Sequence, residues 1–327
     1  LEGTRIAVVS NPVVAPLYGA RVEAVLRRMG LQPFVCLIPD GEQHKTLDTA
    51  ASLYEQFLAG GLDRSGGVLS LGGGVTGDIA GFAAASFMRG VRFVQVPTTL
   101  LSMVDASVGG KTGVDLPQGK NLVGAFKQPD LVLIDPEVLT TLPPEELRAG
   151  MAEVLKHGVI GDPALFADLE AGPQEGQGIG SQQIARALRV KAAIVEEDPF
   201  EQGRRAVLNL GHTVGHALER LSGFRLRHGE GVGIGMVAAA RIAAMLGRAD
   251  SALVGRIEAA LQAWGLPVRC PEFAVEAIWG AMAHDKKRQG SGLRWVLPGA
   301  VGQVEITETV PREVVVAVLQ EMGAKGK

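Results

Sequence analysis

Residues 67–85, GVLSLGGGVTGDIAGFAAA, run from a short apolar stretch through three consecutive glycines into small and apolar residues. The first part is typical of a buried strand, and the part after Gly74 is typical of a helix. Glycines at the carboxyl end of a parallel strand let backbone N–H groups approach a pyrophosphate, and the following helix N-terminus attracts its charge. This is not the usual Gly-x-Gly-x-x-Gly fingerprint after the first strand of a domain, so a turn that serves helix–sheet packing explains the stretch equally well.

Similar apolar stretches lie on both sides of this segment, and helical patterns separate them. Residues 21–30 and 46–61 have the amphipathic spacing of helices. Strands and helices in alternation indicate a mostly parallel sheet with helices on its faces. The expected strands of this sheet are residues 5–10, 33–39, 66–72, 92–96 and 131–135.

The pattern changes at Pro143–Pro144, where one expected helix begins to follow another. We therefore predict an α/β domain over residues 1–143 and an α-helical domain over residues 144–327. Residues 292–298 and 302–307 resemble a small hairpin, and residues 172–183 are expected to form a mobile loop. The expected helices are residues 145–160, 181–197, 211–221, 229–247 and 249–265.

The composition limits the possible functions. The chain has 327 residues and a formal net charge of −3, which gives no electrostatic basis for binding nucleic acid or a membrane. Two cysteines do not make a disulfide framework, and Cys36, inside an apolar stretch, is interpreted as a buried thiol. No secretion signal precedes the first strand, and the longest apolar stretch, residues 231–240, is too short to span a bilayer. We expect a soluble, cytoplasmic protein.

Polar residues gather where the expected strands end. IPDGEQHK (38–45) follows the second strand, and a longer polar segment (96–115) follows the fourth. Ligands of open α/β sheets bind at the carboxyl ends of the strands. Asp78 falls in the first turn of the helix after the glycines, where the helix dipole favours an acidic residue. These features predict a nucleotide site, to which the longer segment contributes Thr98, Thr99, Asp105 and Lys111.

Histidines cluster in LNLGHTVGHALE (208–219) and shortly after it. His212 and His216 are four residues apart and share a helix face, and His228 follows. Neutral imidazoles and carboxylates form Zn²⁺ sites, so the candidate ligands are these three histidines and Glu230. A metalloprotease motif requires a glutamate after the first histidine, and Thr213 occupies that position. A zinc hydrolase is therefore disfavoured.

Glu153 and Lys156 lie three residues apart on another expected helix and share one of its faces. Their spacing alone favours a solvated ion pair. A nucleotide site combined with a divalent metal suggests a different class of chemistry, the oxidation of an alcohol, with hydroxyls bound to the metal and hydride accepted by NAD.

Six segments of the chain, in this order and spacing, resemble one family along nearly its whole length, the 3-dehydroquinate synthases. The second segment is the longest and the most specific of the six. The segments are IPDGEQHKTL (38–47), the stretch from LGGGVTGDIAGF to NLVGAFKQP (71–129), TLPPEELRAGMAEVLKHGVI (141–160), NLGHTVGHALE (209–219), HGEGVGIGM (228–236) and DKKRQGSGLRWVLP (285–298).

The resemblance implies an N-terminal Rossmann-like domain that binds NAD, followed by a helical domain that binds Zn²⁺ or Co²⁺, in a homodimer. The implied reaction converts 3-deoxy-D-arabino-heptulosonate 7-phosphate to 3-dehydroquinate and phosphate, a step of the shikimate pathway to aromatic amino acids. The carbon-5 hydroxyl is oxidised, phosphate is eliminated, the hydride returns, and the ring opens and closes by an aldol reaction. Oxidation acidifies the neighbouring carbon–hydrogen bond, and a metal lowers the pKa of the alcohol.

The resemblance also implies roles for individual residues. Glu153, His212 and His228 match the metal ligands, and His216 matches a residue that hydrogen-bonds the sugar and assists proton transfer. Arg89 matches an arginine that reaches the phosphate in the neighbouring subunit. The other residues that match the substrate site are Lys111, Asn121, Lys156, Lys191, Arg205, Asn209 and one or both of Lys286 and Lys287.

A larger set matches the NAD site, and most of its members follow the strands of the first domain. His44 stands where the family often has an aromatic residue, and DPFEQG (198–203) differs from the usual charged stretch. The chain also begins almost at its first strand, where the family usually has roughly two dozen more residues that form a further strand, which this protein either lacks or has had trimmed. The matching positions are Asn11, Asp40, Gly41, Glu42, Gln43, His44, Lys45, Gly74, Val75, Thr76, Gly77, Asp78, Thr98, Thr99, Asp105, Lys111, Lys120, Leu139, Thr140 and Thr141.

Three other functions compete with this interpretation. Sugar phosphate cyclases of the same fold make valiolone-type or inosose rings, but they generally change the residues at Lys191, Asn209 and His216. A metal-dependent polyol dehydrogenase would produce NADH and would not need the lysines that bind anions. A nucleotide-binding regulatory protein would have a structural metal site, which the open metal position and the cationic pocket disfavour.

Overall fold

The computed structural model describes residues 3–173, 178–289 and 293–326, with the backbone alone for residues 284–289. The chain divides into two compact units, and the division falls between Pro143 and Pro144. The first unit alternates strands and helices, and the second is mainly helical. The α/β class expected for the first unit and the helical class expected for the second are therefore confirmed.

The first unit is built on a parallel sheet of five strands in the order β2-β1-β3-β4-β7. All five predicted strands are present, but the last is two residues long. After it, the N–H of Leu133 still donates to the carbonyl of Gln95 (2.8 Å), while the Leu131 and Leu133 side chains are exposed at the sheet edge. The strands are β1 (Arg5–Ser10), β2 (Gln32–Leu37), β3 (Gly67–Gly72), β4 (Arg92–Pro97) and β7 (Leu131–Val132).

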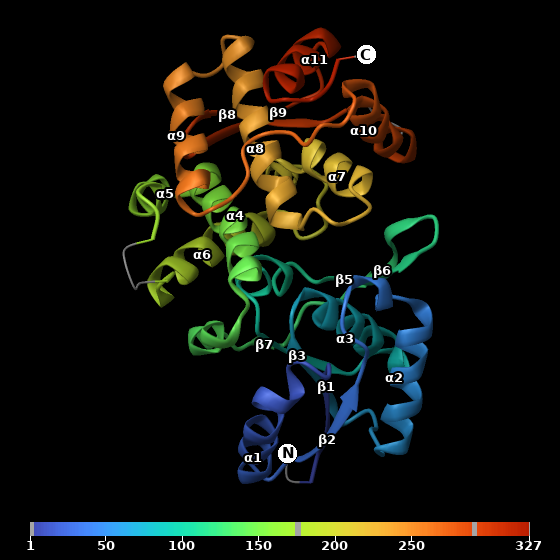
Figure 1. Ribbon diagram of the computed structural model, residues 1–327. Helices are drawn as coiled ribbons and strands as arrows, with labels where there is room; N and C mark the ends of the chain where they lie inside the picture. Colours follow the sequence, from blue (N-terminus) through green and yellow to red (C-terminus); the bar gives the residue numbers. More distant parts are fainter. Residues whose placement is uncertain (1–2, 174–177, 290–292, 327) are drawn as a thin grey trace. The chain divides into compact units, whose positions relative to one another are not determined.

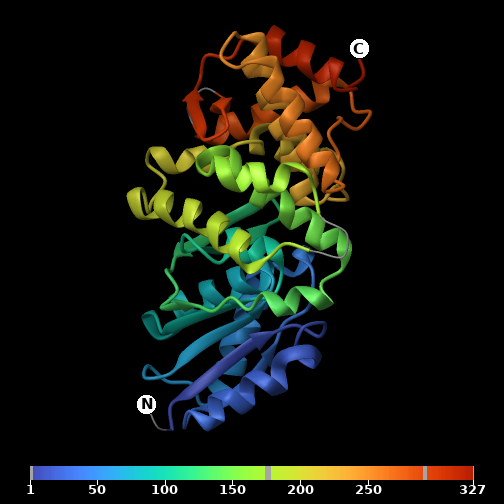
Figure 2. The same ribbon diagram turned by 90° about the vertical axis from the view of Figure 1, so that its left-hand side faces the viewer.

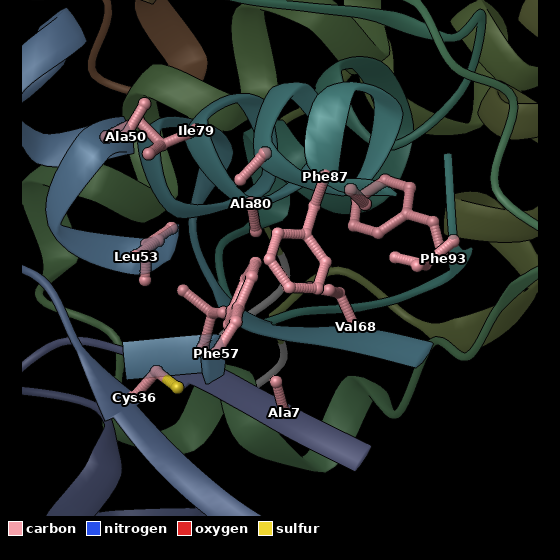
Figure 3. Close-up of a cluster of buried hydrophobic side chains, with 14 of the residues drawn as sticks. Ala7, Cys36, Ala50, Leu53, Phe57, Val68, Ile79, Ala80, Phe87 and Phe93 are labelled. Atoms are coloured by element: carbon pink, nitrogen blue, oxygen red, sulfur yellow. The ribbon is translucent and has the colours of Figure 1, made fainter. Parts of the chain in front are cut away.

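Helices cover both faces of this sheet, as Figure 1 shows. Helix α1 (Ala20–Arg28) packs on the face that carries Val8, while α2 (Leu47–Ala59) and α3 (Gly74–Ser86) pack on the other. The core on that second face contains three aromatic rings, drawn in Figure 3, from Phe57, Phe87 and Phe93. Cys36 is buried beside them, which confirms its interpretation as a core thiol.

The order of the strands determines where a ligand can bind. Strand β1 has β2 on one side and β3 on the other, so the chain reverses its direction of winding between β1 and β3. In open α/β sheets, ligands bind at the carboxyl ends of the strands beside such a reversal. Asn11 directly follows β1, and the three glycines end β3 and begin α3, so both lie at this position.

A two-stranded antiparallel hairpin, β5 (Lys111–Leu116) and β6 (Gly119–Phe126), was not among the predicted elements. It turns at Pro117 and Gln118, which separate two runs rich in glycine and β-branched residues. The hairpin carries Lys111, Lys120 and Asn121, and it therefore brings three predicted site residues onto one element.

The second unit consists of eight helices and a small antiparallel hairpin within the residues that the structure describes. Its helices surround α8, which is buried along most of its length and lies beside α7 and α9 (Figures 1 and 2). The predicted hairpin and five helices are present, whereas α5, α10 and α11 were not predicted. The elements are α4 (Pro144–Gly161), α5 (Pro163–Glu170), α6 (Ser181–Glu197), α7 (His212–Leu221), α8 (His228–Met245), α9 (Ser251–Ala263), α10 (Val275–Gln289), β8 (Trp295–Ala300), β9 (Gln303–Thr307) and α11 (Arg312–Glu321).

Short 3-10 and π-helical turns link several of these elements. In the first unit they are η1 (Ala15–Gly19), η2 (Glu42–His44), η3 (Phe87–Arg89), η4 (Ser102–Ala106) and η5 (Pro136–Thr141), and in the second unit η6 (Arg204–Asn209). Part of the predicted loop, residues 174–177, lies outside the described residues. Among the helices that the structure describes, none combines the length and the apolar character needed to cross a bilayer.

Helix α8 contacts its neighbours through backbone. A Cβ atom added to Gly235 would lie 1.8 Å from the carbonyl oxygen of Gly211, next to α7. A Cβ added to Gly229 would lie 1.9 Å from the carbonyl oxygen of Ala149 on α4. Real atoms cannot approach so closely, so glycine is required at both positions for these helices to pack as they do.

Candidate functional site

The carboxyl ends of β1 and β2 are joined by a side-chain hydrogen bond. Nδ2 of Asn11 donates to Oδ1 of Asp40 at 2.7 Å. The other amide atom of Asn11, Oδ1, accepts from the backbone N–H groups of Val13 and Val14 at 3.0 and 2.9 Å. Asn11 is thereby fixed in the position where the sequence predicted a contact with the nucleotide.

The glycine turn after β3 is tightly packed against its own neighbours. A Cβ on Gly72 would lie 2.6 Å from Oγ1 of Thr76, and a Cβ on Gly73 would lie 3.1 Å from Cγ2 of Thr99. The packing explanation of the glycines therefore holds. Anion binding by the glycine turn is compatible with this packing, because no side chain caps the N-terminus of α3. The first-turn N–H groups there can bind an anion.

A buried lysine connects three segments of the first unit. Nζ of Lys45 lies 2.5 Å from Oδ2 of Asp78 on α3 and donates to Oδ1 of Asn121 on β6 at 2.6 Å. Burial lowers the pKa of Lys45, but the carboxylates of Asp78, Glu42 and Asp115 raise it above its ordinary value. Asp78 is thus the ion-pair partner of Lys45. Asn121 was predicted to bind the substrate, but in the structure it contacts Lys45, which was predicted to bind NAD.

Other predicted residues of the first unit take local partners. Thr99 exchanges hydrogen bonds with Ser102, and Oγ1 of Thr141 lies 2.5 Å from the hydroxyl of Tyr18. Lys120 forms an ion pair with Glu42 at 2.8 Å. Arg89 is exposed in η3 with a left-handed backbone (φ 68°), and Lys111 is exposed at the start of β5.

In the second unit, Glu153, His212 and His228 converge from three helices, α4, α7 and α8. Oε1 of Glu153 lies 3.6 Å from Nε2 of His228 and 4.0 Å from Nε2 of His212. One ligand atom from each of the three residues falls within 4.8 Å of the other two. This spacing permits all three to bind one ion.

The chemistry of the three residues fits a divalent metal. Glu153 is completely buried, and among the described residues neither of its carboxylate oxygens makes a hydrogen bond. A carboxylate buried in this way requires positive charge nearby. One carboxylate and two imidazoles are ligands that Zn²⁺ commonly has in catalytic sites.

Lys156 supplies part of that positive charge. It is 1% exposed and forms an ion pair with Glu153 one helical turn earlier, so the solvated pair favoured by their spacing is wrong. Burial acts to raise the pKa of Glu153, but Lys156, His228 and His212 together hold it well below its ordinary value. Glu153 is therefore ionised and available as a ligand.

The two imidazoles of the cluster differ in their partners. Burial and the charge of Lys156 hold the pKa of His212 well below its ordinary value, and its Nδ1 lies 3.2 Å from the carbonyl oxygen of Leu210. Burial also lowers the pKa of His228, but the carboxylates of Glu153 and Glu219 outweigh it and raise that pKa to about 10. His212 is thus neutral, whereas His228 carries a proton when no metal is bound.

His216 lies beside this cluster, and its ligand atoms do not belong to it. Its ring centroid is 5.0 Å from that of His212, and the residue is exposed. Glu230, a candidate ligand by sequence, instead accepts from the backbone N–H of Arg227 at 2.9 Å and caps α8. Glu219, which sequence reasoning missed, is three residues after His216 on the same face of α7, and this spacing is the signal that could have revealed it.

The predicted anion-binding residues of this unit are held by the polypeptide itself. Lys191 and Arg205 are 6% and 3% exposed, and Arg205 donates to the carbonyl of Pro199 at 2.6 Å. Nδ2 of Asn209 donates to Oε1 of Glu201 at 3.0 Å. The side chains of Lys286 and Lys287, on α10, lie outside the described residues.

Comparison with known proteins gives the family of this chain. Residues 35–149 match the family described as 3-dehydroquinate synthase N-terminal, and residues 150–288 match 3-dehydroquinate synthase C-terminal. The chain is 48% identical over 328 residues to the 3-dehydroquinate synthase of Nostoc punctiforme, an alignment that covers 98% of this chain and 90% of that protein.

Two solved structures of sugar phosphate cyclases are similar in fold. The 2-epi-5-epi-valiolone synthase from Streptomyces hygroscopicus, with NAD⁺ and Zn²⁺ bound, superposes with a TM-score of 0.89 at 29% identity, covering 98% of this chain and 91% of that one. A 2-deoxy-scyllo-inosose synthase with carbaglucose-6-phosphate, NAD⁺ and Co²⁺ gives a TM-score of 0.87 at 26% identity, with the same coverage. The two domain matches, the near-complete alignments and the cluster of Glu153, His212 and His228 agree, and the chain belongs to the 3-dehydroquinate synthase family.

Proposed function

We propose that the chain converts 3-deoxy-D-arabino-heptulosonate 7-phosphate to 3-dehydroquinate and phosphate, as a carbon–oxygen lyase of the shikimate pathway. The observation that carries this proposal is the convergence of Glu153, His212 and His228 in a chain 48% identical to 3-dehydroquinate synthases. Such a ligand set is suited to binding the neighbouring hydroxyls of a sugar.

The site residues fall into three groups, which would bind a metal, a nucleotide and the substrate. Glu153, His212 and His228 would hold Zn²⁺ or Co²⁺. Asn11, the glycine turn and the predicted set around Lys45 would hold NAD at the carboxyl ends of the strands. When bound, the metal and NAD supply an electrophile for the hydroxyl oxygens and an acceptor for hydride.

The buried cations of the second unit support an anionic substrate. Lys191 and Arg205 are almost completely buried, and Lys156 lies against Glu153. Charges in a buried setting are little screened by water, so cations there attract an anionic ligand strongly. The carboxylate and the phosphate of the heptulosonate would be such anions, and Asn209 would add a hydrogen bond to the sugar.

His216 is suited to moving protons at the substrate. It is exposed, unlike the ligand cluster, and its ring lies 5.0 Å from that of His212. A side chain in this position could hydrogen-bond a substrate hydroxyl beside the ligand cluster and exchange its proton. We assign His216 to proton transfer and His212 to metal binding.

The active form would be a cytoplasmic homodimer in which Arg89 reaches the phosphate of the neighbouring subunit. Arg89 is exposed and adopts a left-handed backbone conformation, which is unusual for a long side chain. Backbone conformations of this kind are concentrated at functional sites. Mixing Arg89→Ala chains with chains carrying His216→Ala should restore part of the activity only if the arginine acts across the dimer.

The direct test is to measure phosphate release and ring product from the heptulosonate with Co²⁺ or Zn²⁺ and a small fraction of one equivalent of NAD. We expect many turnovers per NAD, loss of activity with EDTA, and recovery when metal is restored. Accumulation of NADH in proportion to product would instead identify a polyol dehydrogenase. Turnover of sedoheptulose 7-phosphate, which lacks the carboxylate, in preference to the heptulosonate would identify a different sugar phosphate cyclase.

A further inference from the structure

The imidazole of His228 lies between two carboxylates. Nε2 faces Oε1 of Glu153 at 3.6 Å, and Nδ1 is 3.0 Å from Oε1 of Glu219 on the opposite side of the ring. Glu219 belongs to α7 and is 5% exposed. A carboxylate only accepts hydrogen bonds when ionised, so Nδ1 must carry the hydrogen of this bond.

We propose that Glu219 is a positioning residue that keeps His228 in the tautomer with hydrogen on Nδ1, so that Nε2 presents its lone pair to the metal. This inference rests on the metal site of the proposed function. A carboxylate on the far nitrogen of a ligating imidazole fixes the orientation of the ring and raises the basicity of the nitrogen that binds.

Two features of the surroundings hold Glu219 in place. It lies on the face of α7 that also carries His212 and His216, at the i+7 and i+3 positions. Opposite it on α8 is Gly231, where an added Cβ would lie 3.1 Å from Oε1 and 3.2 Å from Cγ of Glu219. The glycine therefore leaves room for the glutamate side chain between the two helices.

The Nδ1 atoms of the two histidine ligands consequently have different hydrogen-bond acceptors. Nδ1 of His212 faces the neutral carbonyl of Leu210 at 3.2 Å, whereas Nδ1 of His228 faces an anion. A charged acceptor makes a hydrogen bond roughly twice as strong as a neutral one. His228 is thus expected to be the stronger imidazole donor to the metal, and Glu219 is the reason.

The test compares Co²⁺ and Zn²⁺ affinity in the wild type, Glu219→Ala and Glu219→Gln, by competition with a chelator. Loss of an outer partner of this kind typically weakens metal binding by about 10- to 100-fold, which we expect for Glu219→Ala. Glu219→Gln keeps an acceptor for the Nδ1 hydrogen and should lose less affinity. Glu258→Gln is the control, because Glu258 on α9 pairs with Arg241, which is thirteen residues after His228 along α8, and the change should leave affinity unchanged.

A second readout separates positioning from general stability. In the Zn²⁺-loaded protein, ¹⁵N NMR should show hydrogen on Nδ1 of His228 in the wild type and in Glu219→Gln. Glu219→Ala should weaken or abolish that signal. If the Ala variant does not fold, the Gln variant, which is close in shape to the native residue, still allows the comparison with the wild type. Metal affinity in Glu219→Ala within about twofold of wild type, or weaker binding by Glu219→Gln than by Glu219→Ala, would overturn the inference. Failure of the wild type to bind either metal would overturn the proposed function itself.

Discussion

Glu153 and His228 lie on different helices, α4 and α8, and yet Oε1 of the buried Glu153 is 3.6 Å from Nε2 of His228. His212, from a third helix, lies 4.0 Å from the same carboxylate oxygen. His216 is one turn further along α7 and is exposed. The two histidines of α7 are therefore expected to have different roles.

His212→Ala should lose the metal, whereas His216→Ala should retain it and lose rate. The first change removes a ligand, and the second removes a general acid or base, whose contribution is typically about 10²- to 10⁴-fold in rate. Metal content after dialysis and kcat would be measured for both variants. Equal loss of metal in the two would contradict the division.

Metal binding should release about one proton at neutral pH. The pKa of His228 is raised to about 10, mainly by Glu153 and Glu219 against the effect of burial, so the metal-free protein holds a proton that a ligand must give up. Between about pH 7 and 10 the apparent affinity should therefore rise with pH, up to about tenfold per unit. Calorimetric titrations in buffers of different ionisation enthalpy count the released protons, and heats that do not depend on the buffer would refute the prediction.

The same proton contributes to the stability of the metal-free fold. Because the folded pKa of His228 lies above its ordinary value of 6.5, this contribution is complete below pH 6.5 and is lost as pH rises toward about 10. The Tm of metal-free protein should therefore fall across this window. With saturating metal the decline should be smaller, since no proton then occupies the ligand nitrogen.

Gly235→Ala should destabilise the second unit by about 1–3 kcal/mol or more, because the new Cβ would overlap the carbonyl of Gly211. The matched control is Gly255→Ala on α9, where an added Cβ meets no atom within 4 Å. That change should stabilise the protein by roughly 0.5–1 kcal/mol, since alanine is the better helix former. Denaturant unfolding of both variants provides the comparison, and similar effects in the two would count against the close helix packing.

Both cysteines should resist thiol reagents in the native protein. Burial raises the pKa of Cys36 to about 12, and it raises that of Cys270 to about 11 despite Arg269. A thiol that is buried and protonated is a poor nucleophile. At pH 8.5 we expect no labelling until denaturant unfolds the chain, when both should react. Rapid labelling of Cys36 without denaturant would show that its core is more open than described.

The sequence predicted the sheet well, because its strands are short, apolar and separated by amphipathic helices. It missed the hairpin of β5 and β6, whose glycines and exposed positions produce no apolar run. Local pattern also could not tell that Lys156 and Glu153 are buried, since their spacing is that of an exposed ion pair and only the surrounding helices exclude water. Glu219 escaped notice for a related reason, because its partner His228 lies on the next helix.

The glycines of α8 have a consequence for the geometry of the ligand cluster. Gly229 meets Ala149 on α4, Gly235 meets Gly211, and a Cβ on Gly215 of α7 would lie 2.9 Å from the carbonyl oxygen of Gly231. The spacing of the helices that carry Glu153, His212 and His228 is therefore set by contact between main chains. Main-chain atoms do not change when a side chain is substituted. Substitutions elsewhere in the second unit should therefore have little effect on the distances between the candidate ligands. Contacts between peptide groups of neighbouring helices therefore determine how far apart the three candidate ligands lie.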